Sequence, residues 1–248
     1  MDGQKLTVRA VERALDVLSC FTASDTDLSL TDIAARVQLH KSTVHRLLAS
    51  LESKEYIVRD PGTEKYRLGF RIWELAANLA RGDEPAQILL PEMEKLRDQV
   101  GETISLYVRD GLERIRIQAV QSNQSIRRVA PVGVRLPIAV GASSKVLIAF
   151  AEPQLRQSIL DQLTWSNEKE PQLFLQQLDE IYKAGYATSM EERESGAAAV
   201  AAPIMNRAHK IVAALSVSGP SSRLDAQKMK EIAPQIMSAA KRMGTMLG

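Results

Sequence analysis

The segment from Leu28 to Arg59 constrains the fold more than any other part of this chain. The spacing of its apolar residues predicts two short helices, joined by a tight turn at residues 38–40 and followed by a strand. Ser29, with Asp32 three positions later, is close to a capping box for the first helix. The apolar stripe of the second helix consists of Val44, Leu47, Leu48 and Leu51. This pattern is typical of a helix-turn-helix, whose second helix lies in the major groove of DNA.

The polar face of the second helix carries groups that bind phosphates. Residues 33–51 include Arg36, Lys41 and Arg46 but no acid, so the local charge is positive although the whole chain has a net charge of only +2. Lysine and arginine neutralise phosphates, and serine and threonine at a helix start donate to phosphate oxygens. We expect Arg46 to make the deepest contact. The full set of expected DNA contacts is Arg9, Lys41, Ser42, Thr43, His45, Arg46, Lys65 and Tyr66.

A hairpin is predicted after the second helix, because Pro61 fixes φ and Gly62 accepts a positive φ between two strand-like runs. Such a hairpin is the wing of a winged helix-turn-helix. Each expected contact also has a plainer interpretation. Ser42 and Thr43 can act only as helix caps, and Arg46 and the other cations can be solvated surface charges.

A single winged domain has a small footprint, so specific binding predicts a dimer that reads two half-sites. The helices expected at residues 7–22 and 70–81 are the candidates for pairing. Their apolar residues, which include Val11, Leu15 and Leu18, can instead pack inside the domain.

Length and composition limit the number of domains and the classes of function that this chain can have. The 248 residues suggest two domains, and a single cysteine, Cys20, excludes an internal disulfide and a multi-cysteine metal site. The N-terminus lacks a signal-peptide pattern and no apolar run is long enough to span a bilayer, so we expect a cytoplasmic protein without membrane contact. Aromatic residues make up only 4% of the chain, which argues against stacking platforms for single-stranded nucleic acid.

From residue 86 the pattern becomes that of an α+β domain. Residues 103–109 and 114–120 alternate around Asp110-Gly111, a hairpin signal. An apolar helix follows Gly141, two amphipathic helices come next, strands return between residues 186 and 218, and a last helix begins near Asp225. The expected domains are a winged helix-turn-helix at 1–69, a linker helix at 70–85 and an antiparallel-sheet domain at 86–248.

Short motifs follow one another in a distinctive order. The N-terminal ones are Leu30, Ile33-Ala34, Ser42-Thr43-Val44, Arg46-Leu47-Leu48, Leu51, Tyr56 and Tyr66-Arg67-Leu68-Gly69. The C-terminal ones are Leu136-Pro137-Ile138, Gly141 to Lys145, Gly185-Tyr186, Glu191-Glu192, Gly196, Ala201 to Ile204 and Leu215 to Pro220. In this order they resemble the IclR family of bacterial transcription regulators over nearly the whole chain. The resemblance implies a GAF-like effector-binding fold, double-stranded operator DNA as a partner, and a homodimer or homotetramer.

The resemblance also places an effector pocket, which would be lined by Ala142, Ser143, Ser144, Ser189, Ala199, Ser216 and Ser218. The helix start at Gly141 exposes amides that favour a carboxylate, and a small hydroxyl-rich site suits an organic or aromatic acid. Alternatively, the two strand serines merely satisfy neighbouring backbone. Arg127 and Arg128 can pair with a second carboxylate, although solvated hairpin charges are the simpler interpretation. The family usually has glycine where Gln38 stands.

Ser144-Lys145 also permits an enzyme in which the lysine activates the serine. Adjacent helical residues point about 100° apart, so we expect no catalysis, and neither a cofactor nor a metal. The leading hypothesis is a ligand-responsive regulator, a repressor or an activator, that controls catabolic genes. The alternatives are an enzyme whose winged domain binds proteins and an architectural DNA-binding protein without a ligand.

Overall fold

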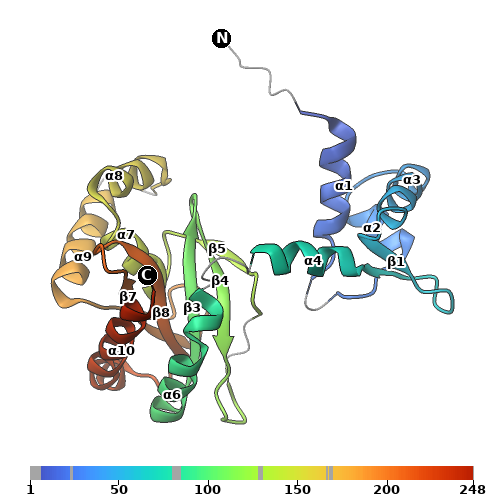
Figure 1. The fold of residues 1–248 in the computed structure, drawn as a ribbon. Helices are drawn as coiled ribbons and strands as arrows, with labels where there is room; N and C mark the ends of the chain where they lie inside the picture. Colours follow the sequence, from blue (N-terminus) through green and yellow to red (C-terminus); the bar gives the residue numbers. More distant parts are fainter. Residues whose placement is uncertain are drawn as a thin grey trace. The chain divides into compact units, whose positions relative to one another are not determined.

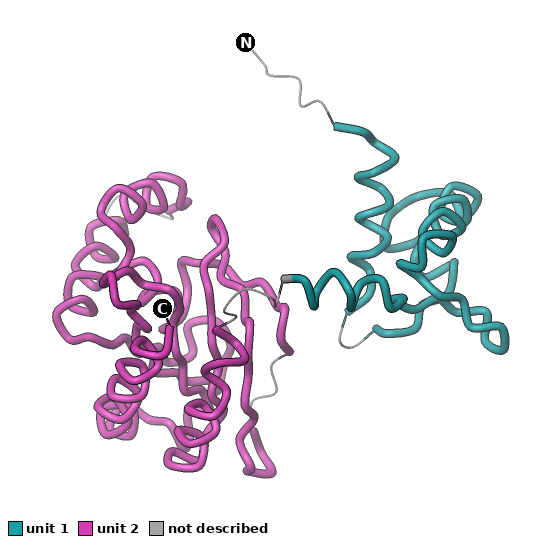
Figure 2. The backbone as a smooth tube through the Cα atoms, viewed as in Figure 1, with its two compact units in different colours: residues 1–82 teal, residues 83–248 magenta. Residues whose placement is uncertain are grey.

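The chain forms two compact units, residues 1–82 and residues 83–248, which Figure 2 distinguishes by colour. Each unit has its own core. The parts of the chain that this computed structural model describes are residues 7–22, 25–79, 85–127, 131–165, 167 and 170–247.

The first unit is a winged helix-turn-helix, as the sequence predicts (Figure 1). Its elements are α1 (Arg9–Ser19), α2 (Leu30–Arg36), α3 (Lys41–Glu52), β1 (Ile57–Arg59), β2 (Tyr66–Leu68) and α4 (Phe70–Leu79). The strands β1 and β2 pair antiparallel and form the wing. The fully buried residues that hold the three helices and the wing together are Val17, Ile33, Val44, Leu48 and Ile57.

Local signals in the sequence account for the geometry of the turn. The capping box at the start of α2 is present, because Asp32 N–H donates to Ser29 Oγ at 3.2 Å and Ser29 N–H donates to Asp32 Oδ2 at 3.0 Å. Bonds from Ser29 lower the pKa of the Asp32 carboxyl. Gln38 adopts φ of +53°, so a residue other than glycine takes the left-handed conformation in the turn.

The second unit is built on one antiparallel sheet with the strand order β5-β4-β3-β8-β7-β6. The strands are β3 (Thr103–Asp110), β4 (Glu113–Val120), β5 (Arg135–Pro137), β6 (Ala187–Met190), β7 (Ala197–Met205) and β8 (Ile211–Pro220). The helices are α5 (Pro85–Ile88), α6 (Leu90–Val100), α7 (Ala142–Ala149), α8 (Pro153–Gln162), α9 (Glu170–Ala184) and α10 (Ala226–Met246). This architecture confirms the predicted α+β class.

The two faces of this sheet bury different side chains. On one face Leu215 and Val217 of β8 pack with α6 and α10 in an apolar core. On the other face Ala214 joins a second core under α7, α8 and α9, and Ser216 and Ser218 lie at alternate positions of the same strand. The sheet is therefore packed on both sides (Figure 1), and its serine-bearing face is the one that α7 covers.

The structure adds detail to the sequence expectations. The run before Pro137 forms the short strand β5, and the helices α5 and α6 precede β3. The last helix runs to Met246, with Pro234 inside it. Residues 80–84 of the expected linker helix fall outside the described residues. Among the described helices, none is both long and apolar enough to cross a membrane.

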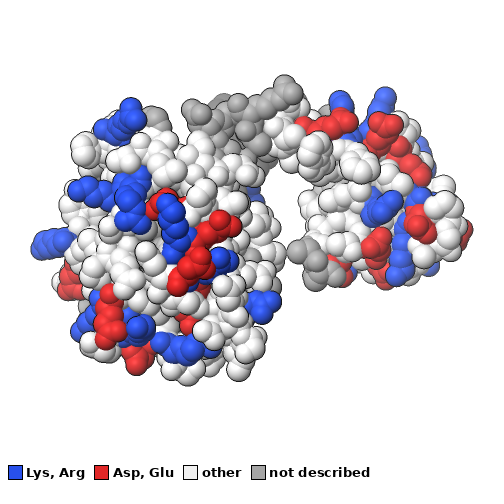
Figure 3. Space-filling model, turned by 60° about the horizontal axis from the view of Figure 1, so that its bottom comes forward, with Lys and Arg blue, Asp and Glu red and all other residues white. Residues whose placement is uncertain are grey.

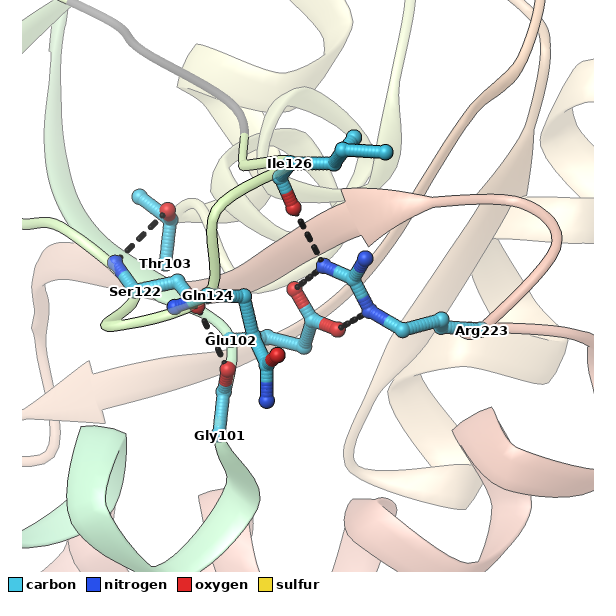
Figure 4. A network of polar contacts seen from close by, with 7 residues as sticks. All are labelled: Gly101, Glu102, Thr103, Ser122, Gln124, Ile126 and Arg223. Atoms are coloured by element: carbon cyan, nitrogen blue, oxygen red, sulfur yellow. Dashed lines mark hydrogen bonds and ion pairs between the residues drawn. The ribbon is translucent and has the colours of Figure 1, made fainter.

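One polar network fastens the segment after β4 to the sheet (Figure 4). Glu102, which is 6% exposed, accepts two hydrogen bonds from the Arg223 guanidinium at 2.6 and 2.9 Å. Arg223 also donates to the Ile126 carbonyl at 2.8 Å, and Ser122 N–H donates to Thr103 Oγ1 at 3.1 Å. These bonds hold residues 122–126 beside the first residue of β3, Thr103, which pairs with Ser218 of β8.

The contact between α6 and α10 predicts a pH dependence of stability. Glu92 accepts hydrogen bonds from Lys95 at 2.7 Å and from Arg242 at 2.8 Å, and these bonds lower its pKa below the ordinary 4.5. A depressed pKa gives stability above the unfolded-state value that disappears as the pH falls through the folded-state value. We expect Glu92→Gln to lower the unfolding free energy by about 1 kcal/mol at pH 7. The difference should vanish in acid.

Urea denaturation of both proteins between neutral pH and pH 3 measures this difference. Glu94→Gln is the matched control, because Glu94 is an exposed acid on the same helix. A wild-type advantage over Glu92→Gln that stays constant across the range would contradict the assignment.

Candidate DNA-binding and effector sites

Helix α3 presents an outward polar ridge above a buried stripe. Val44 and Leu48 are fully buried, whereas Leu47 and Leu51 are half-buried. On the opposite side Lys41, Ser42, His45 and Arg46 are exposed and Thr43 is half-buried, so the structure brings these expected DNA contacts together. The helix begins after His40 and has no side-chain cap. Within the described residues the hydroxyls of Ser42 and Thr43 are therefore not engaged in capping and can donate to phosphates.

The cations around α3 differ in whether an acid of the same unit already pairs with them. Arg36 forms an ion pair with Asp25 at 3.0 Å and donates to the Cys20 carbonyl at 3.0 Å, so its charge is used inside the unit. Lys41 and Arg46 form no ion pair with any described residue. Elsewhere both signs are mixed on the visible face of each unit (Figure 3). The basic character of the ridge is thus local, and it matches the small net charge of +2.

The wing contributes differently from the expectation. Lys65 is exposed, but Tyr66 is 4% exposed and belongs to the core of the unit, where its backbone pairs with Leu28. The alternation of β2 explains this burial, because it turns Arg67 outward in place of Tyr66. Arg67 is therefore a wing cation that the sequence reasoning missed. Arg9 lies exposed at the start of α1, outside the ridge of α3.

The second unit holds a small cavity between the start of α7, the sheet and the loop between β6 and β7. Its volume is about 50 Å³, room for only a few water molecules. Six of the seven expected effector residues line it: Ala142, Ser143, Ser189, Ala199, Ser216 and Ser218. The other lining residues are Tyr107, Arg114, Gly141, Glu192, Arg193, Glu194, Ala197 and Ala198.

Strand register explains why these small residues meet. Ser189 of β6 pairs with Ala199 of β7, Ala199 pairs with Ser218 of β8, and Ser218 pairs with Thr103 of β3. Four neighbouring strands thus place one row of small or hydroxyl side chains on a single face. In the next row Ser216 pairs with Ser105.

Two hydroxyls on this face of the sheet are buried without a partner among the described residues, and one of them, that of Ser218, lines the cavity. Neither Ser105 Oγ nor Ser218 Oγ has a hydrogen bond to any described residue. Ser105 is fully buried and Ser218 is 7% exposed. A buried hydroxyl without a partner is costly, and it commonly marks a position that a ligand or an ordered water completes.

Ser144 lies behind the cavity wall rather than on it. Its hydroxyl donates to the Pro137 carbonyl at 3.0 Å and accepts a hydrogen bond from the Arg114 guanidinium. Arg114 is 4% exposed and also donates to the Pro137 carbonyl at 3.1 Å, and its guanidinium lies over the ring of Tyr107 at 5.3 Å. Ser144 therefore positions Arg114, which the sequence analysis did not single out.

A carboxylate of the protein itself occupies the start of α7. Gly141 N–H donates to Glu192 Oε2 at 3.1 Å, and the Lys145 ammonium pairs with Glu192 Oε1. The Lys145 side chain is 5% exposed and that of Glu192 is 30% exposed. The sequence predicts a ligand carboxylate at this helix start, and in the structure the side-chain carboxylate of Glu192 lies at that position.

A second buried guanidinium, that of Arg116, does not line the cavity but bonds to the lining residue Tyr107. Arg116 is 2% exposed and donates to Tyr107 Oη at 3.0 Å and to the Pro131 carbonyl at 3.3 Å. No described carboxylate lies within ion-pair distance of Arg116. Buried guanidinium groups whose charge is not neutralised favour an anion nearby. Arg127, in contrast, is exposed and bonds to Gln121 and Gln124, while Arg128 falls outside the described residues.

The cavity does not have the geometry of a catalytic site. Ser144 contacts Arg114 and Pro137, whereas Lys145 contacts Glu192, so the adjacent pair does not form a nucleophile and its base. Within the described ranges no cluster of three or more His, Cys, Asp or Glu residues is placed to hold a metal. A winged helix-turn-helix and a separate ligand-cavity domain together define a DNA-binding transcription regulator.

Comparison with known proteins gives the family. Residues 10–61 match the IclR helix-turn-helix domain, and residues 84–245 match the bacterial transcriptional regulator IclR C-terminal domain. The chain therefore belongs to the IclR family, whose members are DNA-binding regulators rather than enzymes.

Individual relatives share its full architecture. The HTH-type transcriptional regulator XynR of Escherichia coli K12 is 30% identical, over 97% of this chain and 98% of its own. The repressor AllR of the same organism is 29% identical, over 97% and 90%. The crystal structure of an IclR homolog from Microbacterium hydrocarbonoxydans complexed with 4-hydroxybenzoate is 27% identical, with a TM-score of 0.78 over 95% of this chain and 98% of that one.

The ridge of α3 predicts a selective loss of DNA binding. An arginine that contacts a base edge contributes about 1–3 kcal/mol, so Arg46→Ala should weaken binding to a preferred duplex about 10-fold or more. Lys230→Ala is the control, because it removes one exposed cation from the second unit. Fluorescence anisotropy at fixed salt measures both variants. Equal effects of the two substitutions would reduce Arg46 to a nonspecific charge.

Two buried serines, one lining the cavity and one behind its wall, predict stability changes of opposite sign. Ser218→Ala removes an unsatisfied hydroxyl and should raise the unfolding free energy by about 1 kcal/mol. Ser144→Ala removes a hydroxyl with two partners and should lower it by about 1–2 kcal/mol. Chemical denaturation without ligand measures both changes. Destabilisation by both substitutions would mean that Ser218 already has a partner.

Proposed function

We propose that this family member binds operator DNA through α3 and the wing, and that a small organic acid in the cavity beside α7 controls this binding. The observation that carries the proposal is the cavity itself, in which the buried Arg114 and the unpartnered hydroxyl of Ser218 lie beside the start of α7. Cations and helix amides favour a carboxylate, and buried hydroxyls distinguish polar substituents on it. Binding at operator DNA also assigns the protein to the cytoplasm.

Exposed apolar faces in the first unit support self-association. Val8, Val11 and Leu15 follow helical spacing along α1 and are 64%, 55% and 56% exposed. Phe70 and Trp73 of α4 are 84% and 69% exposed. Large apolar side chains exposed together mark contact surfaces. We assign them to pairing of two copies, which gives the two half-site contacts that one winged domain lacks.

The kind of acid follows from the lining. The IclR homolog from Microbacterium hydrocarbonoxydans binds 4-hydroxybenzoate, a carboxylate with a second polar group. In this chain Ser189, Ser216 and Ser218 offer hydroxyls opposite the helix start, so an organic or aromatic acid with a hydroxyl or oxo substituent fits the site. Such acids are typical products of catabolic routes, and we propose catabolic genes as the targets.

This proposal predicts that acids, but not their amides, stabilise the protein. Thermal-shift assays with acetate, butyrate, benzoate and 4-hydroxybenzoate should give at least one increase in melting temperature that the matching amide does not give, because a ligand that binds the native state stabilises it. The active acid should also change affinity for the preferred duplex. If the protein binds a preferred duplex and no acid changes its affinity for that duplex, the result would instead favour an architectural DNA-binding protein.

A further inference from the structure

The loop between β6 and β7 carries an internal substitute for a ligand carboxylate. Glu192 lies on this loop at residues 191–196, and its two oxygens bind different groups of α7. One oxygen accepts from Gly141 N–H at 3.1 Å, and the other pairs with the ammonium of Lys145. These are the two groups that a carboxylate at this helix start would use.

The site has room for one such anion. Lys145 is 4% exposed, and Glu192 is the one described acid with which it forms an ion pair. A buried ammonium needs a negative partner, yet a second carboxylate at the same place would be repelled by the first. The cavity is also small, with a volume of about 50 Å³, while Glu192 stays in place.

The loop is anchored at its two ends and contacts the start of α7 through Glu192. Glu191 N–H donates to the Ala197 carbonyl at 2.8 Å, and Ser221 Oγ donates to Glu191 Oε1 at 2.9 Å. Ser221 N–H donates to the Gly196 carbonyl at 2.8 Å. These bonds fix the bases of the loop and do not involve Glu192. The Glu192 side chain can therefore leave α7 without breaking the pairing of β6 with β7.

A second observation marks the same cavity as a ligand site. Ser218 is 7% exposed, lines the cavity and has a hydroxyl without a partner among the described residues. Glu192 thus fills the anion position while the hydroxyl position beside it remains unsatisfied, which is the arrangement expected of a placeholder that completes only part of the site.

We propose that Glu192 is an intramolecular competitor, which holds the carboxylate position of the effector site until an acid ligand displaces it and releases the loop. This inference rests on the proposed function for the identity of the ligand, but not for the existence of the anion position. Exchange of one carboxylate for another keeps Lys145 paired throughout. Because an acid must displace Glu192, the wild-type protein binds it more weakly than a protein without this carboxylate would. Binding of the acid then moves the loop.

The test uses propionate, which reproduces the end of a glutamate side chain, and propionamide, its neutral analogue. Calorimetry should show that Glu192→Ala and Glu192→Gln bind propionate at least 10-fold more tightly than the wild type. Neither variant should bind propionamide. Glu194→Ala is the matched control, because it removes the same charge from the same loop, and it should gain less than threefold. Equal or weaker binding of propionate by both Glu192 variants overturns the proposal.

Two further measurements guard against a folding artefact. If Glu192→Ala does not fold alone, refolding in propionate should succeed and refolding in propionamide should fail. In the wild-type protein, saturating propionate should accelerate tryptic cleavage after Arg193, whereas unchanged or slower cleavage there contradicts displacement of the loop.

The outcomes separate this inference from the proposed function. If the Glu192 variants gain affinity but no acid alters DNA binding by the wild type, the anion position stands and the effector role fails. If acids alter DNA binding by the wild type but the Glu192 variants gain nothing, the effector role stands and the competition is overturned.

Discussion

The side-chain alternation of β8 is the constraint on which the second unit depends. Every second residue of this central strand, such as Leu215 and Val217, enters the apolar core beneath α6 and α10. The residues between them, Ser216 and Ser218, must then point to the other face. A shift of one residue in register would exchange the two sets and bury the hydroxyls among the core side chains. The apolar core therefore fixes the position of the cavity.

Helical spacing and strand alternation also determine which parts of the structure could be predicted from the sequence. Val44 and Leu48 on one side of α3, and Lys41 and Arg46 on the other, follow from helical spacing and are placed as expected. The six cavity residues came from family resemblance, and the strand register explains why they meet. Such predictions succeed because period and register are local properties of the chain.

What the sequence could not supply are contacts between distant segments. Glu192 reaches Gly141 across 51 positions and Arg114 reaches Ser144 across 30, and no periodicity links either pair. Arg114 and Arg116 had one usable signal, because an alternating strand places both on the face of Tyr107. Tyr66 shows the opposite failure, in which a residue of the wing motif lies in the core and leaves Arg67 outside. Motif membership does not determine which way a side chain points.

Under the proposed function, electrostatics more than shape would set the class of ligand that the cavity accepts. The buried Arg114 lines the cavity, Arg116 bonds to the lining residue Tyr107, and the buried Lys145 pairs with Glu192, the carboxylate bonded to the helix start. Removing the partner of a buried ion pair typically costs about 3–5 kcal/mol. A neutral molecule that displaced Glu192 would incur this cost, whereas an acid would not. The charge at the helix start, rather than the serine hydroxyls of the sheet, would thus discriminate acids from their neutral analogues. The unpartnered hydroxyl of Ser218, which lines the cavity, would then distinguish only among acids.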